Sequence, residues 1–346
     1  MSDTGLESSV RAARRAPARF GSLHLSRARL ELALPAFVIA VAVAHLARQQ
    51  GLAVGPDTWL DILGGHQIVG HGLPRHDTLT VLAHGHPWVD QQWLAQLVVY
   101  GGYTLGGLGL LKLANAALLL GALTIALAVG LRRCGSAVAV SGVALLGEIV
   151  LFDRSLIRAE TIAQLLYVVL LAVVFAEARR PSRRIMLLFP ILLIWANVHG
   201  TVVLGAAIVA GAGLIDMRRG EVRRGAALLV GAALSTLASP YATGLPGYYG
   251  STLGNPALQS WATEWQAPSI STAPQTYLLA LLVVVFLARG WRRLLPIERL
   301  VICLAVPLAL STIRSSPWLV YPAIMALPAA LTGEASVSRY RMARPL

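Results

Sequence analysis

Apolar runs alternate with short polar and basic segments along almost the whole chain. A membrane hydrocarbon core of about 30 Å takes roughly 20 apolar residues of helix, and shorter helices are tolerated where protein or water surrounds them. Ten stretches fit this description: 30–47, 108–131, 136–151, 161–177, 185–198, 201–216, 225–238, 276–289, 296–312 and 316–332. The pattern therefore predicts an all-α, polytopic integral membrane protein with about ten transmembrane helices.

Arginines are concentrated in every second segment between these stretches. Pairs such as Arg132-Arg133 and Arg183-Arg184 lie on one side of the predicted membrane. The intervening segments hold only Arg48, Arg75, Arg154, Arg158 and Arg314. By the positive-inside rule the arginine-rich side is cytoplasmic, so we predict that both termini are cytoplasmic and call the opposite side the outer face.

Composition agrees with this topology and excludes several classes of protein. The chain of 346 residues is 56% hydrophobic and 13% charged, with a mean hydropathy of +0.66 and a net charge of +13. A soluble domain this apolar could not cover its own surface. The arginines lie in short clusters between apolar runs, which argues against nucleic acid as a partner. The two cysteines, Cys134 and Cys303, indicate neither a disulfide framework nor a zinc site.

The topology divides the chain into three parts. Residues 1–29 form a basic cytoplasmic tail, 30–332 the membrane domain, and 333–346 a second cytoplasmic tail. Two large outer loops, about 49–107 and 239–274, interrupt the membrane domain. Membrane lipids are therefore expected partners along most of the chain.

The first outer loop contains two predicted surface helices. One is the helix over 58–71. It begins at Pro56, Asp57 and Thr58, which we interpret as a turn and N-cap. The apolar stretch 93–105 would invert the charge pattern of every later loop if it crossed the membrane. We therefore predict that it lies at the outer surface.

Residues 185–216 must cross the membrane and return within about 32 residues, because both flanks are rich in arginine. Two helices of about 15 residues rise only about 22 Å each. The apex Asn197–Gly200 should therefore lie below the outer surface, and polar backbone at that depth requires protein or a water-filled cavity around it. The sequence predicts a recess that opens outward.

Acidic and histidine side chains gather on the outer face. They are Asp57, Asp61, Asp77, Asp90, Asp153, Glu160 and Glu264, with His66, His71, His76, His84, His86 and His199. Five of these histidines lie within 66–86, but their spacing fits no compact ligand motif, so hydrogen bonding is favoured over a divalent metal ion. No motif for ATP hydrolysis, zinc proteolysis or serine hydrolysis is present. Any chemistry is expected on the outer face.

Several separated blocks resemble one family. They are G-P-D-T-W-L-D-I-L-G-G-H-Q-I-V-G-H-G-L-P-R-H-D-T-L-T at 55–80, G-H-P-W-V-D-Q-Q-W-L at 85–94, W-A-N-V-H-G at 195–200, S-P-Y-A-T-G at 239–244, E-W-Q-A-P at 264–268, and Arg314 before the last stretch. Together they resemble bacterial GT-C-superfamily membrane glycosyltransferases, including proteins with P-D-T-W-W, H-G-x-P-R-x-D and P-W-V-x-x-E-W-L patterns.

This resemblance implies a multi-pass enzyme of the bacterial inner membrane that takes a sugar from a polyprenyl-phosphate carrier. The sugar passes, with inversion, to a glycan, lipid or protein acceptor on the outer face. The matching catalytic position is Asp57, which would accept the proton of the acceptor hydroxyl. Arginines such as Arg314 would hold the carrier phosphate. No cofactor is certain.

Two departures from the family pattern keep other functions open. Gln92 stands where relatives often carry Glu, and the chain is shorter than many family members. One alternative is an inactive scaffold that assembles with a cell-envelope synthase as a partner subunit. The other is a lipid or solute transporter, which should carry charges within its spans and internal repeats. Away from the predicted cytoplasmic ends of the spans, only Lys112 and Glu148 carry a formal charge.

Each acidic candidate also has a structural explanation. Asp57 is either the base or an N-cap. Asp61, one turn later on the same helix face, either joins it as a metal ligand or is simply solvated. Asp77 either contributes to substrate binding or closes an Asx turn. Asp90 is expected to cap the helix that follows it.

The remaining candidates are cationic or aromatic. Arg314 is expected to bind phosphate or to pair with an acid such as Glu264, and Arg158 either binds phosphate or is neutralised by Glu160. His199 contacts the lipid phosphate or the acceptor, or makes a structural hydrogen bond. The aromatic residues of the second loop either hold a sugar or lie among lipid headgroups, with the headgroup position favoured. They are Tyr241, Tyr248, Tyr249, Trp261 and Trp265. If one site exists, Asp57, His199 and Arg314 should converge on one cavity.

Overall fold

A computed structural model describes residues 27–49, 53–152, 155–252 and 255–332. These residues are almost entirely helical and form no strand. In chain order the helices are α1 (Arg27–Arg48), α2 (Pro56–His71), α3 (Trp93–Cys134), α4 (Ala137–Phe152), α5 (Ala159–Arg179), η1 (Arg183–Leu187), α6 (Leu188–Val198), α7 (Val202–Arg218), α8 (Val222–Leu237), η2 (Ala242–Gly244), α9 (Leu245–Thr252), α10 (Pro256–Trp261), η3 (Thr263–Trp265), α11 (Pro274–Gly290), η4 (Trp291–Arg293), α12 (Pro296–Ser311), η5 (Ile313–Ser315) and α13 (Pro317–Leu331). The predicted all-α class is confirmed.

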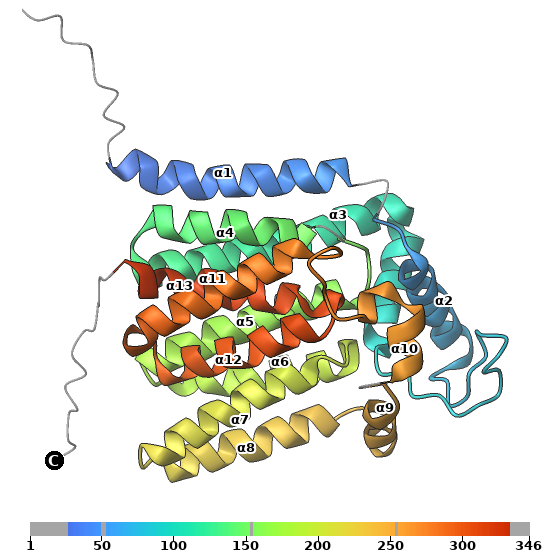
Figure 1. Ribbon diagram of the computed structural model, residues 1–346. Coiled ribbons are helices and arrows are strands. Elements are labelled where there is room, and N and C mark those ends of the chain that lie inside the picture. The colour runs from blue at the N-terminus through green and yellow to red at the C-terminus, as the bar shows by residue number, and fades with distance from the viewer. Residues whose placement is uncertain (1–26, 50–52, 153–154, 253–254, 333–346) are drawn as a thin grey trace, which may run out of the picture.

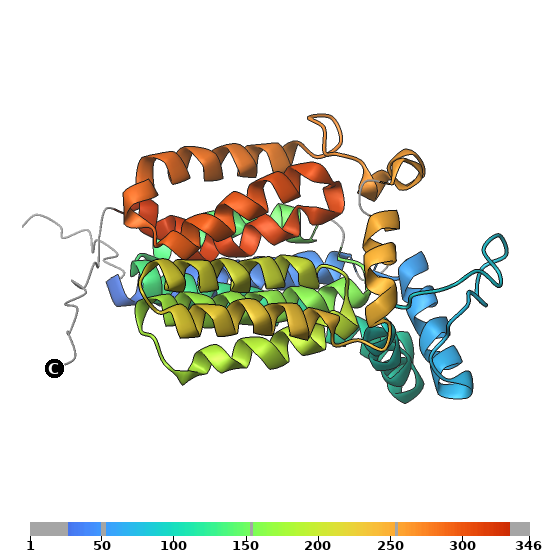
Figure 2. The same cartoon turned by 90° about the horizontal axis from the view of Figure 1, so that it is seen from below.

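The helices form a bundle with a cap at one end (Figure 1). Most run roughly side by side, whereas α2, the first part of α3, α9 and α10 gather beyond one end of the bundle (Figures 1 and 2). We call this the cavity end. The opposite end carries the turns η1, α7–α8 and α11–α12, and we call it the arginine end because Arg133, Arg179 and Arg224 lie there. The first residue of α1 and the last of α13 also lie at the arginine end (Figure 1).

Helix α3 changes direction at two glycines. Gly106 has φ −153° and ψ 16°, and Gly107 has φ 61° and ψ −158°, so the helical geometry is interrupted there. A positive φ is readily adopted only by glycine, which lets the chain turn from the cap into the bundle. The expected helix over 93–105 is therefore present in the cap, separated by this kink from the long bundle segment.

Helix α13 forms the centre of the core. Every residue from Trp318 to Ala330 is buried. Its Trp318 stacks on Trp195 at 5.9 Å, and Tyr167 packs edge-on against Trp318 at 5.1 Å. Glycines on α3, α4 and α11 leave no room for a Cβ against α13, which allows close helix packing. The core therefore surrounds the segment that follows the Arg314 turn.

A helix lies at each of the ten predicted apolar stretches, but the ten-span count is not confirmed. Among the described residues, four helical segments are long and apolar enough to cross a membrane: Glu31–Gln49, Trp93–Cys134, Ala159–Arg179 and Pro274–Arg293. A fifth arises if α8 and the following segment Ala242–Thr252, bent by 99°, count as one span. The apolar helices indicate a membrane protein. Asp153, Arg154 and the two predicted tails lie outside the described residues.

Candidate functional site

A cavity of about 580 Å³ lies where the cap meets the bundle. Its charged lining residues are Asp57, Asp61, Arg158, Glu160 and Arg314. Polar groups come from Gln92, His199, Thr201, Tyr248 and Tyr249, and apolar surface from Leu60, Val203, Leu204, Leu308 and Trp318. Residues from segments far apart in the sequence thus share one space that both charged and apolar side chains line.

Helix α2 is fastened to the start of α5, and this junction places Asp57 beside Arg158. The Thr58 hydroxyl donates to the Ile157 carbonyl at 2.7 Å, and the Ile157 amide donates to the Ala53 carbonyl at 2.8 Å. Asp61 Oδ2 accepts the amide of Ala159, the first residue of α5, at 3.1 Å. Asp61 therefore satisfies an amide that the first turn of a helix cannot pair internally.

Asp57 is not the N-cap expected from the sequence. Helix α2 begins at Pro56 with Gly55 as its N-cap, and Gly55 donates its amide to Thr58 Oγ1 at 3.1 Å. The Asp57 side chain is instead 43% exposed and lies 3.6 Å from Arg158 Nη1. A capping role therefore does not explain Asp57, which is free to act on a ligand in the cavity.

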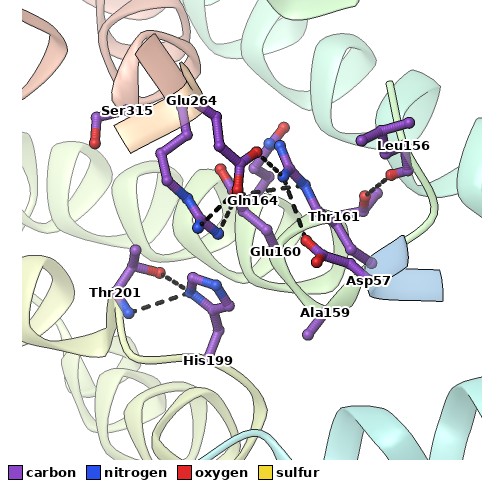
Figure 3. Close-up of polar contacts among 12 residues, drawn as sticks. Asp57, Leu156, Ala159, Glu160, Thr161, Gln164, His199, Thr201, Glu264 and Ser315 are labelled. Carbon is purple, nitrogen blue, oxygen red and sulfur yellow. Dashed lines mark hydrogen bonds and ion pairs between the residues drawn. The ribbon is translucent and has the colours of Figure 1, made fainter. Parts of the chain in front are cut away.

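Two arginines and three carboxylates form a network on the cavity wall (Figure 3). Arg158 Nη1 lies 2.9 Å from Glu264 Oε2, and Arg158 Nε lies 3.5 Å from Glu160 Oε2. Arg314 contacts Glu160 Oε2 and Glu264 Oε1, each at 3.3 Å, and its guanidinium stacks over the Trp265 ring at 4.7 Å. The surrounding carboxylates raise the pKa of Arg158 above its usual value despite burial, which opposes the rise. The Arg158 guanidinium is therefore charged, and carboxylates hold both guanidinium groups in position.

Burial separates the acids of this network. The Glu160 side chain is 2% exposed, and its Oε1 has no hydrogen-bond partner among the described residues. Glu264 is 26% exposed and belongs to the short turn η3. Glu264 does not line the large cavity but contacts both arginines beside it. Of the alternatives for Arg314 and Arg158, pairing with acids is thus observed, and both arginines still face the cavity.

Asp61 is buried, so the expectation that it is solvated was wrong. Burial raises its pKa to about 7, the amide of Ala159 opposes the rise, and the charges of Asp57 and Asp90 add to it. A carboxyl group with this pKa exchanges a proton near neutral pH. Asp61 therefore offers a second proton-accepting group on the same cavity, one helical turn from Asp57.

The turn between α6 and α7 carries His199 into the cavity. Its Nδ1 lies 2.9 Å from the Thr201 hydroxyl and accepts the Thr201 amide at 3.3 Å. Burial lowers the pKa of His199 to about 4, while the neighbouring Glu160 opposes the fall. The imidazole is therefore neutral at physiological pH. Figure 3 shows the ring on the side of the turn that faces the charged network.

The sequence blocks named above pack against one another in pairs. Trp93 Nε1 donates to Asn197 Oδ1 at 2.8 Å, which joins the first outer loop to the α6–α7 turn. Arg75 Nη1 donates to the Pro240 carbonyl at 3.1 Å, and Tyr241 donates its hydroxyl to the Pro74 carbonyl at 2.7 Å. Segments 49–107 and 239–274 are therefore joined by direct hydrogen bonds.

Asp77 lies apart from the network. Its carboxylate accepts the amides of Leu79 and Thr80 and the Thr80 hydroxyl, at 2.6 to 2.9 Å, and these bonds lower its pKa. Asp77 lines a separate, smaller cavity of about 140 Å³. The Asx turn thus describes its contacts, and the structure does not bring it to the other candidates.

Asp90 and the histidines also differ from the charged network. Helix α3 begins at Trp93 with Gln92 as its N-cap, so Asp90 is not the cap. Asp90 accepts Gln96 Nε2 at 2.9 Å, and burial raises its pKa to about 6. Within the described ranges no group of three or more His, Cys, Asp or Glu side chains could hold a metal ion.

Sequence reasoning underestimated Glu160 and the residues of the second loop. Arg158 and Glu160 are two positions apart, which suggested mutual neutralisation, whereas Glu160 also contacts Arg314. Tyr248, Tyr249 and Trp265 line the cavity, so these three members of the aromatic loop are placed to contact a ligand. The available signal was an acid in the first turn of an apolar helix, where burial is costly without partners.

Comparison with known proteins adds no relative. No family model matches the chain, and no curated protein or solved structure matches it.

Proposed function

We propose that the protein is a membrane glycosyltransferase with a GT-C-like arrangement of about ten transmembrane helices. It would move a sugar from a polyprenyl-phosphate carrier to a glycan, lipid or protein acceptor at the outer face of the bacterial inner membrane. The cavity end would then face outward, and the arginine end would face the cytoplasm. The proposal rests on the sequence resemblance and on one structural observation.

That observation is the convergence of Asp57, Arg158, Arg314 and His199 on one cavity. A transfer of this kind needs a carboxylate to accept the proton of the acceptor hydroxyl and cations to stabilise the leaving phosphate. Asp57 supplies an accessible carboxylate, and the two arginines supply the cations. The apolar residues that also line this cavity suit the first part of a lipid chain.

The chemistry can be assigned to atoms of this chain. Asp57 would accept the proton from the attacking hydroxyl as the new glycosidic bond forms on the opposite face of the sugar. The bond from the sugar to the phosphate oxygen breaks, and its electron pair remains on the phosphate. Arg158 and Arg314, held by Glu160 and Glu264, would stabilise this developing charge without reorganisation.

Replacing Asp57 with Asn tests the proposal. Membranes containing the protein are supplied with radiolabelled polyprenyl-phosphate sugars, and transfer of label from the carrier is measured. We expect Asp57→Asn to slow transfer by about 10²- to 10⁴-fold, the usual contribution of a general base. The matched control is Asp216→Asn, because Asp216 pairs with Arg224 at the arginine end. Unchanged transfer by a folded Asp57→Asn protein would contradict the role of Asp57.

One observation favours the alternative of an inactive scaffold. Arg158 contacts three carboxylates and Arg314 contacts two, so the positive charge is already balanced within the chain. A scaffold predicts that the wild-type protein transfers no label from any carrier while it still co-purifies with an envelope synthase. Transfer that depends on Arg314 but survives removal of such a partner would exclude the scaffold.

A further inference from the structure

The hydrogen bonds around His199 fix the position of its proton. A backbone amide can only donate, so His199 Nδ1 must accept from the Thr201 amide at 3.3 Å. The indole of Trp195 also only donates, and it donates to Thr201 Oγ1 at 3.2 Å. Because Nδ1 carries no proton, the Thr201 hydroxyl donates its hydrogen bond to His199 Nδ1 at 2.9 Å. In the neutral imidazole the remaining proton is on Nε2.

The Nε2–H group is a hydrogen-bond donor without a partner in the part of the chain that the structure describes. The residue lines the large cavity and is drawn with its ring toward the charged network (Figure 3). His199 is half-buried, and a donor at the edge of a cavity is available to a ligand or water that can accept from it.

Glu160 supplies the complementary acceptor. Both arginine contacts of Glu160 are made through Oε2, and its buried Oε1 has no hydrogen-bond partner among the described residues. Glu160 lines the same cavity and is close enough to His199 for their charges to interact. One neutral donor and one carboxylate acceptor therefore line the same cavity, and no hydrogen bond joins them in the described part of the chain.

This pair is complementary to an alcohol. A hydroxyl group donates one hydrogen bond and accepts others, so one hydroxyl can satisfy both side chains. An ionised phosphate has no proton to donate to Glu160, and the negative charge of the Glu160 carboxylate would repel it. We propose that His199 Nε2–H and Glu160 Oε1 form a hydroxyl-binding subsite on the cavity wall, with a sugar or polyol hydroxyl as its ligand.

This inference rests on the proposed function for its choice of sugar, because either the donor sugar or the acceptor can supply the hydroxyl. It also gives the two oxygens of Glu160 different roles. Glu160 Oε2 holds the arginines that face a phosphate, and Glu160 Oε1 faces the hydroxyl beside it. The site would then bind a sugar hydroxyl next to a phosphate.

The first test is the protonation of His199. The protein is labelled with ¹⁵N-histidine, and the His199 signals are identified by their absence in His199→Phe. At pH 7 we expect a proton on Nε2 and none on Nδ1, and the Nε2–H proton resonance should move when an alkyl glycoside is added. A proton on Nδ1, or an imidazolium at pH 7, would overturn the proposal.

The second test measures binding to protein in lipid nanodiscs. The probes are three compounds with the same short alkyl chain: an alkyl glycoside, an alkyl phosphate and an alkyl phosphate sugar diester. We expect His199→Phe to weaken binding of a hydroxylated probe by about 3- to 10-fold, as for one neutral hydrogen bond, and to leave the alkyl phosphate unchanged. His199→Gln keeps an N–H donor and should restore part of the affinity.

The probes also distinguish the two sources of the hydroxyl. A loss confined to the glycoside assigns the subsite to the acceptor, and a loss confined to the diester assigns it to the donor sugar. Equal losses for all three probes, or no loss for either sugar probe, would overturn the subsite. Binding requires no transfer, so a selective loss in a protein that transfers nothing would retain the subsite and reject the proposed function.

Glu160→Gln provides an independent arm. Its matched control is Glu298→Gln, because Glu298 is also a buried carboxylate that contacts two arginines. We expect Glu160→Gln to weaken the sugar probes and Glu298→Gln to leave them unchanged in proteins that remain folded. Equal effects of the two variants would contradict a local role for Glu160.

Discussion

Glu160 and Glu298 are buried carboxylates that each contact two arginines, but they lie at opposite ends of the bundle. Glu298 Oε1 contacts Arg133 and Arg179 at 3.0 and 2.9 Å, and its Oε2 accepts the amide of Leu295 at 2.8 Å. Both oxygens of Glu298 are thus in use. Glu160 makes its two arginine contacts at 3.3 to 3.5 Å through Oε2 alone.

The spaces around these two acids differ in the same sense. Glu160 lines the cavity of about 580 Å³, whereas a pocket at the arginine end, which Glu298 does not line, has a volume of about 30 Å³. A carboxylate whose two oxygens are both hydrogen-bonded, with no cavity beside it, holds helices together. A carboxylate with one unbonded oxygen beside a cavity can bind a ligand. The comparison therefore separates a structural network from a candidate site, although both use the same residue types.

The largest expected effect is on stability at the arginine end. Removing one partner of a buried ion pair leaves uncompensated charge and costs about 3 to 5 kcal/mol. Glu298→Gln should therefore lower the thermal unfolding temperature in detergent markedly, and more than Glu160→Gln does. Glu160 already has an unsatisfied oxygen, and Arg158 and Arg314 keep Glu264 as a partner. If Glu160→Gln is the more destabilising of the two, the assignment of the networks must be exchanged.

The next largest effect is an increase in stability, and it is expected for replacement of Asp61. Its pKa of about 7 lies above its ordinary value of 3.8, so the folded protein holds a proton that the unfolded chain releases. Between about pH 4 and 7 this group makes the protein less stable as pH rises. Asp57 and Asp90 strengthen the effect, and Arg158 weakens it.

Asn at position 61 keeps an oxygen for the Ala159 amide but carries no charge. Asp61→Asn should therefore stabilise the protein at pH 8, by on the order of 3 kcal/mol, and make no difference near pH 4. Thermal unfolding of both proteins across this range is the measurement. A variant that is less stable than wild type at pH 8 would show that the charged carboxylate stabilises this end, as it does at the arginine end.

Much of the fold followed from the sequence because its causes are local or topological. Helices lie at all the apolar stretches, and the charge pattern kept residues 93–105 out of the count of spans. The short length of 185–216 predicted that the apex Asn197–Gly200 borders a recess, and His199 of this apex lines the cavity. Asp57, His199 and Arg314 were predicted to lie on one face of the molecule, and all three line one cavity.

The partners within the site depend on packing that one sequence does not encode visibly. Asp61 is buried because α2 is tied to the start of α5, some hundred positions away. Whether Arg314 pairs with Glu160 or Glu264 depends on how η3 and η5 meet, and it contacts both. Asp57 differs because the preceding Gly55 takes the capping position. The sequence correctly predicted a helix start here, but the N-cap is Gly55, two residues before Asp57.

The smallest expected effect is that of Glu264→Gln. Glu264 contacts both cavity-end arginines, but it is partly exposed on a short turn. Exposed ion pairs contribute about 0 to 1 kcal/mol, and both arginines retain Glu160. We therefore expect the unfolding free energy to fall by less than about 1 kcal/mol.

Function should be more sensitive than stability to this change, because Glu264 orients the guanidinium of Arg314 above the Trp265 ring. Binding of the alkyl phosphate should change while the alkyl glycoside binds as in the wild-type protein. Tryptophan fluorescence during phosphate titration, with Trp265→Phe to identify the signal, measures this directly. A large loss of stability in Glu264→Gln would instead place the cavity-end network with that of Glu298, as a fastening between helices.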